Sequence, residues 1–371
     1  MRGTDGRYRI AVLGNCCTHG EFVVSALRGE ERAELVGGWE PDPLRGPGLA
    51  EALGGDLAES PEELIDDPSV DIVAVATSPH EKAEIVELAA SAGKHIFLNK
   101  PMAESLASAR RIVDAVRDHG VHLVHDIVVF RFSSITARLL QEVREGAFGR
   151  PLHYAHSWGM TFSRDFPLAA VWPERIDEAG RSGGGEMTNM GCYAIDYMTA
   201  MWGLPRSVQA KWMRTWGVYA EAGVENFGQL VADYGDFFAV LAVGKQAIRS
   251  LPSMDVKEAL QPRNWHNVME VQFEGTNLTL LPYDGLVIRD GHRIEPNEFV
   301  AGVDCPTPFQ SLVRAIETGR PPDSDAEAGS LGVEVLMAAY LSILEERPVE
   351  LPLADGSNPL VPSREQTRRG G

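Results

Sequence analysis

Short apolar runs alternate with amphipathic segments through the first third of the chain. The run Val70–Thr77 is almost entirely β-branched or alanine, and Glu81–Ala92 repeats its apolar residues at helical spacing. Continuous apolar strands separated by helices are typical of a parallel sheet that is covered on both faces and joined by right-handed crossovers. The pattern therefore predicts an α/β domain with a doubly wound parallel sheet over residues 1–127.

The rest of the chain has a different pattern. Segments such as Leu152–Met160 and Gln229–Tyr234 alternate or run short, and turn signals such as Asp284-Gly285 separate several of them. This pattern indicates meandering antiparallel strands. We expect an α+β domain over residues 128–371, with one large, mainly antiparallel open sheet of about six or seven strands flanked by helices, and a loose tail over 357–371.

Composition and charge narrow the range of functions. The 371 residues carry 34 Lys and Arg against 53 Asp and Glu, a formal net charge of −19. Such a surface repels phosphate backbones and anionic lipid, so neither a nucleic acid nor a membrane is expected as a partner. The four cysteines, without a CxxC pair or an HExxH helix, indicate neither a disulfide framework nor a metal site. Because no apolar leader is visible, the sequence predicts a cytoplasmic protein.

The turn after the first predicted strand is the expected ligand site. In a doubly wound sheet, ligands bind at the carboxyl edge of the strands, and this turn reads GNCCTHG over residues 14–20. A phosphate-binding G-x-G-x-x-G turn would have glycine at positions 14, 16 and 19, and only the first is present. The turn is weak evidence when taken alone. Its candidate cofactor contacts are Gly14, Asn15, Cys16, Thr18 and His19.

The ends of the next strands supply further candidates. Glu40 follows the second strand, where a carboxylate accepts hydrogen bonds from a ribose 2′-OH and repels the 2′-phosphate of NADP. The alternative is that Glu40 begins a solvated loop. Lys100, after the fourth strand, is by residue type more often a solvated loop residue than a catalytic one. The remaining candidates at this edge are Thr77, Ser78, Pro79, His80 and Asn99.

Two separated motifs favour a functional interpretation of this edge. Asn99-Lys100-Pro101 follows the fourth strand, and GGGEMTNMGCYAID occupies residues 183–196. With Ala92–Ala103, Arg144–His153 and Ala315–Pro322, they resemble the glucose–fructose oxidoreductase / inositol dehydrogenase / MocA (Gfo/Idh/MocA) family of two-domain oxidoreductases. The motifs agree in order and spacing over nearly the whole chain.

The resemblance implies an NAD-binding Rossmann domain, with NADP less favoured, and a second domain that binds a sugar, cyclitol or related polyol. It implies that Lys100 and Tyr193 share the proton transfer, because a phenol with an unperturbed pKa of ~10 needs a neighbouring cation to act as a base. Asn189 is implied as a hydrogen-bonding partner of the substrate, and Arg131 as a contact to the nicotinamide end. The resemblance also implies a homodimer or homotetramer formed through the second sheet.

The chain departs from the family pattern at several site positions. The glycine turn is altered, and Asn99 stands where the family has Glu. Asn189 and Tyr193 stand where it frequently has Asp and His, and an asparagine cannot act as a base. Trp158 and Arg164 are candidate substrate contacts, through stacking on a sugar ring and through bidentate binding of an anion. The alternatives are a core tryptophan and a solvated arginine.

The sequence leaves three functions open. The first is an NAD-dependent oxidoreductase that moves a hydride between nicotinamide and a secondary hydroxyl, or the matching ketone, of a sugar or polyol. The second is a lyase, epimerase or glycosidase that recycles its NAD while acting on a sugar. The third is a sugar sensor or scaffold that has lost catalysis, and the missing glycines and Asn189 favour it.

Overall fold

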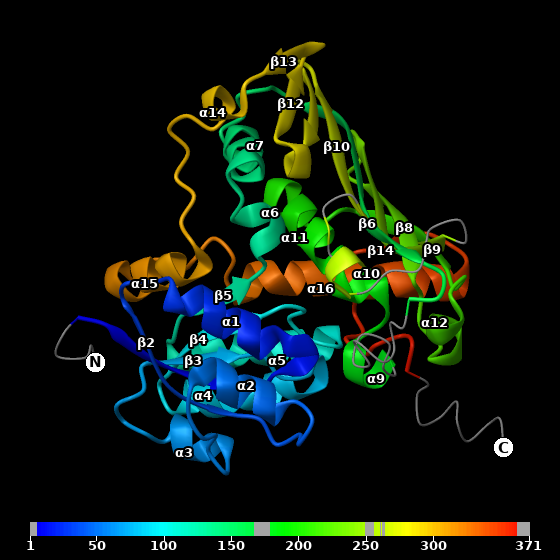
Figure 1. Ribbon diagram of the computed structural model, residues 1–371. Coiled ribbons are helices and arrows are strands. Elements are labelled where there is room, and N and C mark those ends of the chain that lie inside the picture. The colour runs from blue at the N-terminus through cyan, green and yellow to red at the C-terminus, as the bar shows by residue number, and fades with distance from the viewer. Residues whose placement is uncertain (1–5, 167–178, 249–255, 260, 262–263, 362–371) are drawn as a thin grey trace. The chain divides into compact units, whose positions relative to one another are not determined.

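The computed structural model describes residues 6–166, 179–248, 256–259, 261 and 264–361 (Figure 1). It divides the chain into two compact units. The first unit comprises Met1–Ile127 and Pro306–Ser330, and the second comprises Val128–Cys305 and Leu331–Gly371. The sequence predicted one continuous second domain from residue 128 onward, so the assignment of Pro306–Ser330 to the first unit differs from that expectation.

The first unit contains the doubly wound parallel sheet that the apolar runs predicted. Its strand order is β2-β1-β3-β4-β5, and every neighbouring pair is parallel. All four residues of β3 are buried, as expected for a strand covered on both faces. The strands are β1 (Tyr8–Leu13), β2 (Ala33–Trp39), β3 (Ile72–Val75), β4 (His95–Asn99) and β5 (Leu123–Asp126). The helices are α1 (His19–Arg28), α2 (Gly46–Leu53), α3 (Pro61–Ile65), α4 (Lys82–Ser91), α5 (Leu106–His119) and α15 (Pro308–Thr318).

The late segment Pro306–Ser330 joins the first unit because α15 packs against β4 and β5. After this helix, Ser324 pairs with the edge strand: its carbonyl accepts a hydrogen bond from His125 N at 2.6 Å, and its Oγ donates to His125 O at 2.9 Å. Local sequence also defines α15, since Thr307 and Gln310 form a capping box and Gly319 ends the helix at φ +71°. These contacts link residues about two hundred positions apart, and sequence periodicity carries no information about them.

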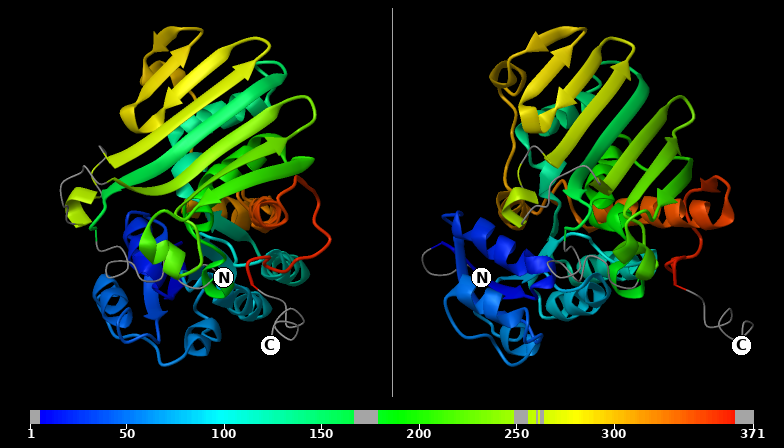
Figure 2. Two further views of the ribbon diagram at one scale, coloured as in Figure 1. Left: turned by 90° about the vertical axis from the view of Figure 1, so that its right-hand side faces the viewer. Right: turned by 45° about the vertical axis from the view of Figure 1, so that its right-hand side comes forward.

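The second unit is built on a nine-stranded sheet in the order β13-β12-β11-β10-β6-β9-β8-β7-β14 (Figure 2). The sheet is mainly antiparallel, as expected, but it is larger than the predicted six or seven strands and is not a simple meander. The long strand β6 lies between β10 and β9, and its pairing with β9 is parallel. The strands are β6 (Pro151–Ser163), β7 (Ser207–Met213), β8 (Phe227–Asp233), β9 (Phe238–Ile248), β10 (Trp265–Phe273), β11 (Asn277–Leu281), β12 (Leu286–Arg289), β13 (His292–Ile294) and β14 (Val349–Glu350).

Helices cover one face of this sheet. Along β8, buried residues alternate with exposed or half-buried ones, and α10 and α11 contact β9. The helices of this part of the chain are α6 (Val128–Arg131), α7 (Ser134–Arg144), α9 (Ala179–Ser182), α10 (Glu186–Asn189), α11 (Gly191–Trp202), α12 (Gly217–Glu221), α13 (Val256–Ala259), α14 (Pro296–Phe299) and α16 (Ala326–Glu345). Among the described residues, α16 alone has the length and apolarity of a membrane span, but 61% of its apolar window is buried inside the protein, as in a core helix.

Candidate active site

Gly14 makes the turn between β1 and the segment that leads into α1. Its φ is +90°, and a Cβ there would lie 2.5 Å from Thr77 N at the end of β3, so only glycine fits. A short 3₁₀ helix, η1 (Cys16–Thr18), follows, in which Cys17 and Thr18 both adopt left-handed φ values of 53° and 61°. The first glycine of the expected fingerprint therefore has the predicted role, and non-glycine residues adopt a conformation that side chains rarely take.

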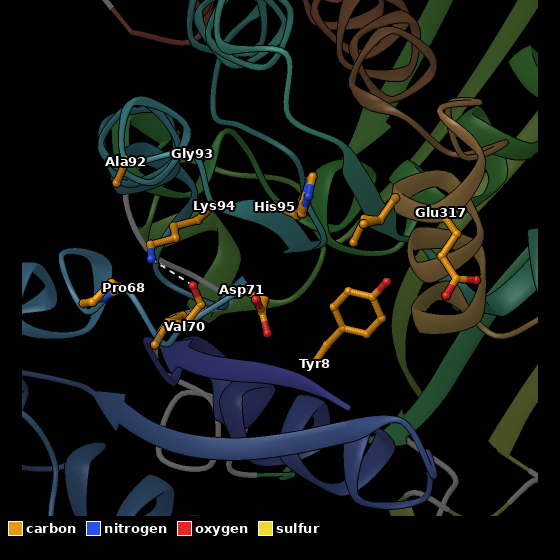
Figure 3. Close-up of a pocket in the computed structure, with 10 residues that line it drawn as sticks. Tyr8, Pro68, Val70, Asp71, Ala92, Gly93, Lys94, His95 and Glu317 are labelled. Atoms are coloured by element: carbon orange, nitrogen blue, oxygen red, sulfur yellow. Dashed lines mark hydrogen bonds between the residues drawn. The ribbon is translucent and has the colours of Figure 1, made fainter. Parts of the chain in front are cut away.

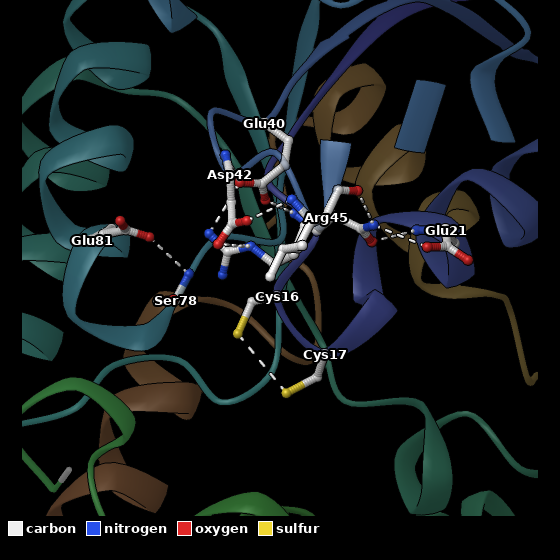
Figure 4. Close-up of polar contacts among 10 residues, drawn as sticks. Cys16, Cys17, Glu21, Glu40, Asp42, Arg45, Ser78 and Glu81 are labelled. Carbon is white, nitrogen blue, oxygen red and sulfur yellow. Dashed lines mark hydrogen bonds and ion pairs between the residues drawn. The ribbon is translucent and has the colours of Figure 1, made fainter. Parts of the chain in front are cut away.

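The carboxylate of Glu40 is buried beneath this turn (Figure 4). Its Oε2 accepts a hydrogen bond from Asn15 N at 2.7 Å, and its Oε1 accepts from Asp42 N at 2.9 Å and from Arg45 at 3.0 Å. Glu40 is therefore not a solvated loop residue: it connects the end of β2 to the turn after β1. Arg45, which the sequence did not single out, supplies the compensating charge that a buried carboxylate requires.

Three buried polar atoms at the same edge have no hydrogen-bond partner within the described part of the chain. They are Thr77 Oγ1, His80 Nδ1 and Asn99 Oδ1. Ser78 and Pro79 lie between the first two, where Ser78 and Glu81 form a capping box at the start of the 3₁₀ helix Pro79–Glu81. Buried polar atoms are almost always satisfied, so these atoms fit an edge that binds a polar ligand such as a dinucleotide.

The segment after β4 is held by buried side chains. Lys82 Nζ donates to the carbonyl oxygens of Asn99 and Pro101, the latter at 2.6 Å. Asn99 Nδ2 donates to Asp126 Oδ2 at 3.0 Å, across paired positions of β4 and β5. Burial raises the pKa of Asp126 to about 6, although its hydrogen bond to Asn99 and the ammonium groups of Lys82 and Lys100 act in the opposite direction. Lys100 is buried, so it is not a solvated loop residue either.

In the second unit, Gly184 and Gly185 of the GGG motif let the backbone pass close to the Tyr340 side chain and to the backbone of Glu225. A Cβ on Gly185 would lie 2.0 Å from Glu225 O, and one on Gly184 would lie 2.1 Å from Tyr340 Oη. The Glu225 carboxylate accepts hydrogen bonds from Gly185 N at 3.1 Å, Met187 N at 2.8 Å and Tyr340 Oη at 2.9 Å. Complete burial raises the pKa of Glu225 to about 7 despite these donors.

A second buried carboxylate lies on α10. Glu186 Oε1 accepts from Lys245 Nζ at 2.5 Å and from Tyr219 Oη at 2.6 Å, and all three side chains are fully buried. Glu186 Oε2 accepts from Asn189 Nδ2 at 3.0 Å. The predicted substrate contact Asn189 is thus fixed by an ion pair that sequence analysis missed, although a glutamate between three glycines and an apolar helix was a visible signal.

Tyr193 lies on α11 with its ring half-buried, one turn beyond Asn189. The ring of Trp158 meets it edge to face, with centroids 5.5 Å apart. Trp158 is 2% exposed and donates from Nε1 to Tyr283 Oη at 2.8 Å. The structure therefore corrects the expected sugar-stacking role of Trp158: this side chain is a core tryptophan that supports Tyr193.

The two predicted arginine contacts lie in different environments. Arg131 is buried, and its guanidinium binds Asp196 through Nε at 2.5 Å and Nη2 at 3.2 Å. Its charge is therefore matched inside the second unit, where it holds α6 against α11. Arg164 follows β6 and is exposed.

The predicted cofactor contact His19 is the first residue of α1, and its ring packs against Phe22, with ring centroids 6.4 Å apart.

A separate hollow of about 460 Å³ opens at the other edge of the parallel sheet (Figure 3). Its lining includes Tyr8, Asp71, Lys94, His95 and Glu317. Lys94 Nζ is held there by the carbonyl oxygens of Asp67 at 2.6 Å and Val70 at 2.8 Å. Burial lowers the pKa of His95 to about 4, so its ring is neutral. This hollow lies at the amino ends of the strands, away from the edge where ligands of doubly wound sheets bind.

The described residues contain no group of three or more His, Cys, Asp and Glu side chains that could hold a metal ion.

Comparison with known proteins identifies the family. Residues 8–126 match the model of an oxidoreductase family with an NAD-binding Rossmann fold, and residues 136–256 match the GFO/IDH/MocA C-terminal domain. The chain belongs to the GFO/IDH/MocA family of oxidoreductases. The first unit is accordingly the NAD-binding domain of this family member.

The names of several sequence relatives describe enzymes that act on sugars or cyclitols. Levoglucosan dehydrogenase of Pseudarthrobacter phenanthrenivorans is 31% identical over 155 residues, which cover 40% of this chain and 38% of that protein. Inositol 2-dehydrogenase of Acidothermus cellulolyticus is 34% identical over 160 residues, covering 41% of this chain and 46% of the relative. The matched part of the chain thus spans less than half the length of either relative.

Solved structures confirm the fold over almost the whole chain. A levoglucosan dehydrogenase in complex with NADH and levoglucosan covers 94% of this chain and 100% of its own, with a TM-score of 0.75 at 18% identity. The WlbA dehydrogenase of Chromobacterium violaceum, in complex with NADH and UDP-GlcNAcA, has the same TM-score of 0.75 at 21% identity and covers 95% of this chain and 99% of its own. At these identities the likeness shows the fold and does not define the substrate.

Proposed function

We propose that this chain is an NAD-dependent oxidoreductase that moves a hydride between nicotinamide and a secondary hydroxyl, or the matching ketone, of a sugar, cyclitol or related polyol. The observation that carries the proposal is a set of buried polar atoms at the edge of an NAD-binding domain that have no hydrogen-bond partner among the described residues, namely Thr77 Oγ1, His80 Nδ1 and Asn99 Oδ1. The names of the sequence relatives support the substrate class.

The residues that would hold NAD come from the ends of the first four strands. Gly14, Asn15 and the η1 segment form the turn after β1, which in doubly wound folds binds the pyrophosphate, and Glu40 would accept hydrogen bonds from the adenosine ribose. Farther along the same edge, the atoms of Thr77, His80 and Asn99 that lack a partner within the described ranges would form hydrogen bonds with the cofactor. When bound, NAD supplies the hydride acceptor or donor, which no protein side chain provides.

In this proposal, Tyr193 takes the proton from the reacting hydroxyl, or returns it to the ketone oxygen. Lys100 polarises that oxygen and favours the phenolate, and each unit by which a cation lowers the pKa of a phenol corresponds to about 1.4 kcal/mol. Trp158 fixes the ring of Tyr193, and Asn189 holds a second hydroxyl of the substrate. Arg164 remains a candidate substrate contact, because its side chain is exposed and so can reach a ligand.

The exposed face of the nine-stranded sheet is the proposed contact between copies of the chain. Phe238 is 53% exposed and Val231 is 37% exposed on neighbouring strands, so this face offers apolar side chains to a second copy. Light scattering after gel filtration measures the assembly directly: a dimer or tetramer supports this contact, and a monomer at micromolar concentration excludes it.

Calorimetric titration with NAD⁺, NADH and NADPH tests the function, followed by absorbance assays with NAD⁺ and a panel of levoglucosan, inositols and pentoses. We expect micromolar binding with a preference for NAD(H), and NADH production with at least one polyol. Nucleotide that copurifies and does not exchange would favour the lyase, epimerase or glycosidase alternative. Folded protein that binds no nucleotide at millimolar concentration would exclude both enzymes and favour a sensor or scaffold.

A further inference from the structure

Asn189 is the last residue of α10 and the one residue of this helix that is not buried, and its side chain contacts a buried charge. Its Nδ2 donates to Glu186 Oε2 at 3.0 Å, and Glu186 is fully buried whereas Asn189 is not. An ionised carboxylate can only accept hydrogen bonds, so it must face the nitrogen of the amide. The amide oxygen of Asn189 is consequently turned away from Glu186.

The charge of Glu186 is fixed by its other contacts. Lys245 Nζ and Tyr219 Oη both donate to Oε1, at 2.5 Å and 2.6 Å, from side chains that are themselves fully buried. A buried carboxylate without such donors would take up a proton, and a protonated acid could face either end of the amide. The Lys245 ion pair therefore keeps Glu186 an obligate acceptor and so determines the orientation of Asn189.

We propose that Glu186 is a positioning residue that makes Asn189 a hydrogen-bond acceptor for one substrate hydroxyl, so that the site selects a hydroxyl there over a group that can only accept. The inference rests on the proposed function and deepens it, because it names the polarity that the substrate must present. An alcohol O–H satisfies the amide oxygen of Asn189, whereas a C–F group or an ether oxygen at the same position faces it with a second acceptor.

The substitution Glu186→Gln reverses this polarity. Lys245 and Tyr219 both need an acceptor, so the glutamine must turn its oxygen toward them and its nitrogen toward Asn189. Asn189 then rotates to offer its oxygen to the glutamine and presents its N–H₂ to the substrate. In the double variant Glu186→Gln with Asn189→Asp, the aspartate accepts from the glutamine and again presents an acceptor outward.

The test uses the polyol that the wild-type protein turns over, together with its isosteric monodeoxyfluoro analogues. For one analogue we expect the wild-type KM to exceed that of the parent polyol by about tenfold, as for one hydrogen bond, with little change in kcat. The ratio of the KM for this analogue to the KM for the parent polyol should fall toward one in Glu186→Gln. It should return to about ten in the double variant. The matched control Tyr219→Phe removes one donor to Glu186 and leaves the ratio unchanged, because Lys245 still holds the carboxylate.

A ratio that is unchanged in folded Glu186→Gln, or not restored in the double variant, overturns the inference. If Glu186→Gln does not fold, Glu186→Leu with Lys245→Met removes both charges together, and the KM ratio should still fall toward one, because no carboxylate then requires the amide nitrogen of Asn189 to face inward. A wild-type ratio of one for every fluoro analogue also overturns it. These outcomes leave the proposed function intact, since each requires an active wild-type enzyme.

Selective ¹⁵N-asparagine labelling supplies a readout that needs no substrate. The side-chain amide of Asn189, assigned by its loss in Asn189→Asp, should show a downfield proton that donates to a charged carboxylate. This proton should move upfield in Glu186→Leu with Lys245→Met, and an unchanged position overturns the inference. If the wild-type protein turns over no polyol, the proposed function fails, and this spectrum still decides the orientation of Asn189.

Discussion

The carboxylate of Glu40 accepts a hydrogen bond from the backbone N–H of Asn15 at 2.7 Å, which joins the end of β2 to the turn after β1. Arg45, which binds the other oxygen of the same carboxylate at 3.0 Å, balances its charge. An acidic residue at this place can accept hydrogen bonds from a ribose diol, and a nearby arginine without an acidic partner can bind a 2′-phosphate. We therefore expect the Glu40–Arg45 pair to set the preference between the two nicotinamide dinucleotides.

Glu40→Ala should weaken NAD⁺ binding by about tenfold or more, because it removes a charged hydrogen-bond acceptor and loosens the turn. The ratio of NADP⁺ to NAD⁺ affinity should rise, since Arg45 loses its buried partner. Calorimetric titration with both nucleotides measures the two affinities. Asp42→Asn is the matched control, because it removes a negative charge beside Arg45 but leaves Asn15 and Glu40 joined. An unchanged affinity ratio in Glu40→Ala would contradict this assignment.

Lys100→Met and Tyr193→Phe should each lower kcat by roughly 10²- to 10⁴-fold, the usual contribution of a positioned proton-transfer group. NADH affinity should stay within about threefold of the wild-type value in Tyr193→Phe, because the phenol is assigned to the substrate and not to the cofactor. Steady-state kinetics and NADH fluorescence titration separate the two effects. Lys211→Met, at an exposed position of β7, serves as the control and should retain full activity. Retained kcat in either site variant removes that residue from the proposed chemistry.

Glu225 should make the stability of the protein depend on pH. Burial raises its pKa from 4.5 to about 7, so the protonated form is favoured in the folded state. Its contribution to stability is complete below pH 4.5 and is lost as the pH rises through about 7. The free energy of unfolding of Glu225→Gln relative to wild type should therefore increase by roughly 3 kcal/mol over this range. Urea denaturation at several pH values measures it, and parallel pH curves for the two proteins would refute the prediction.

Gly185→Ala should destabilise the second unit by roughly 2–5 kcal/mol, because a Cβ 2.0 Å from the backbone oxygen of Glu225 forces the chain apart. Activity should fall with stability, since the same backbone leads into α10 and Asn189. The matched control is Gly217→Ala, where a Cβ meets nothing within 4 Å. Thermal unfolding followed by circular dichroism compares the two variants. Equal melting temperatures would mean that the backbone near Glu225 relaxes without cost.

Local patterns were sufficient to predict the parallel sheet and the turn at Gly14. The buried run of β3 is defined by neighbouring residues along the chain, so its continuous apolar pattern reveals it. The place of β6 in the middle of the second sheet was not predictable in this way. Its neighbours β9 and β10 come much later in the chain, and a strand pattern does not state which strand it will pair with.

The partners of the site residues were also beyond the sequence pattern. Asn99 and Asn189 stood out as departures from the family pattern. The orientation of each side-chain amide, however, depends on the carboxylate to which it donates, Asp126 for Asn99 and Glu186 for Asn189. Lys245 lies 59 residues from Glu186, and only the folded chain brings these charges together. Residue type alone allowed Trp158 to be either a core side chain or a surface for stacking a sugar ring. Its burial, which the sequence does not reveal, favours the core role.

The return of Pro306–Ser330 to the first unit affects how the protein is made on the ribosome. The N-terminal sheet is synthesised first, but Ser324, which pairs with its edge strand β5, follows every strand of the second sheet except β14. An unpaired edge strand readily pairs with other chains, and N-terminal domains usually complete their folding during synthesis. In this chain the domain that is translated first is completed late, so the nascent protein must keep an open sheet edge in solution while most of its second sheet is being made.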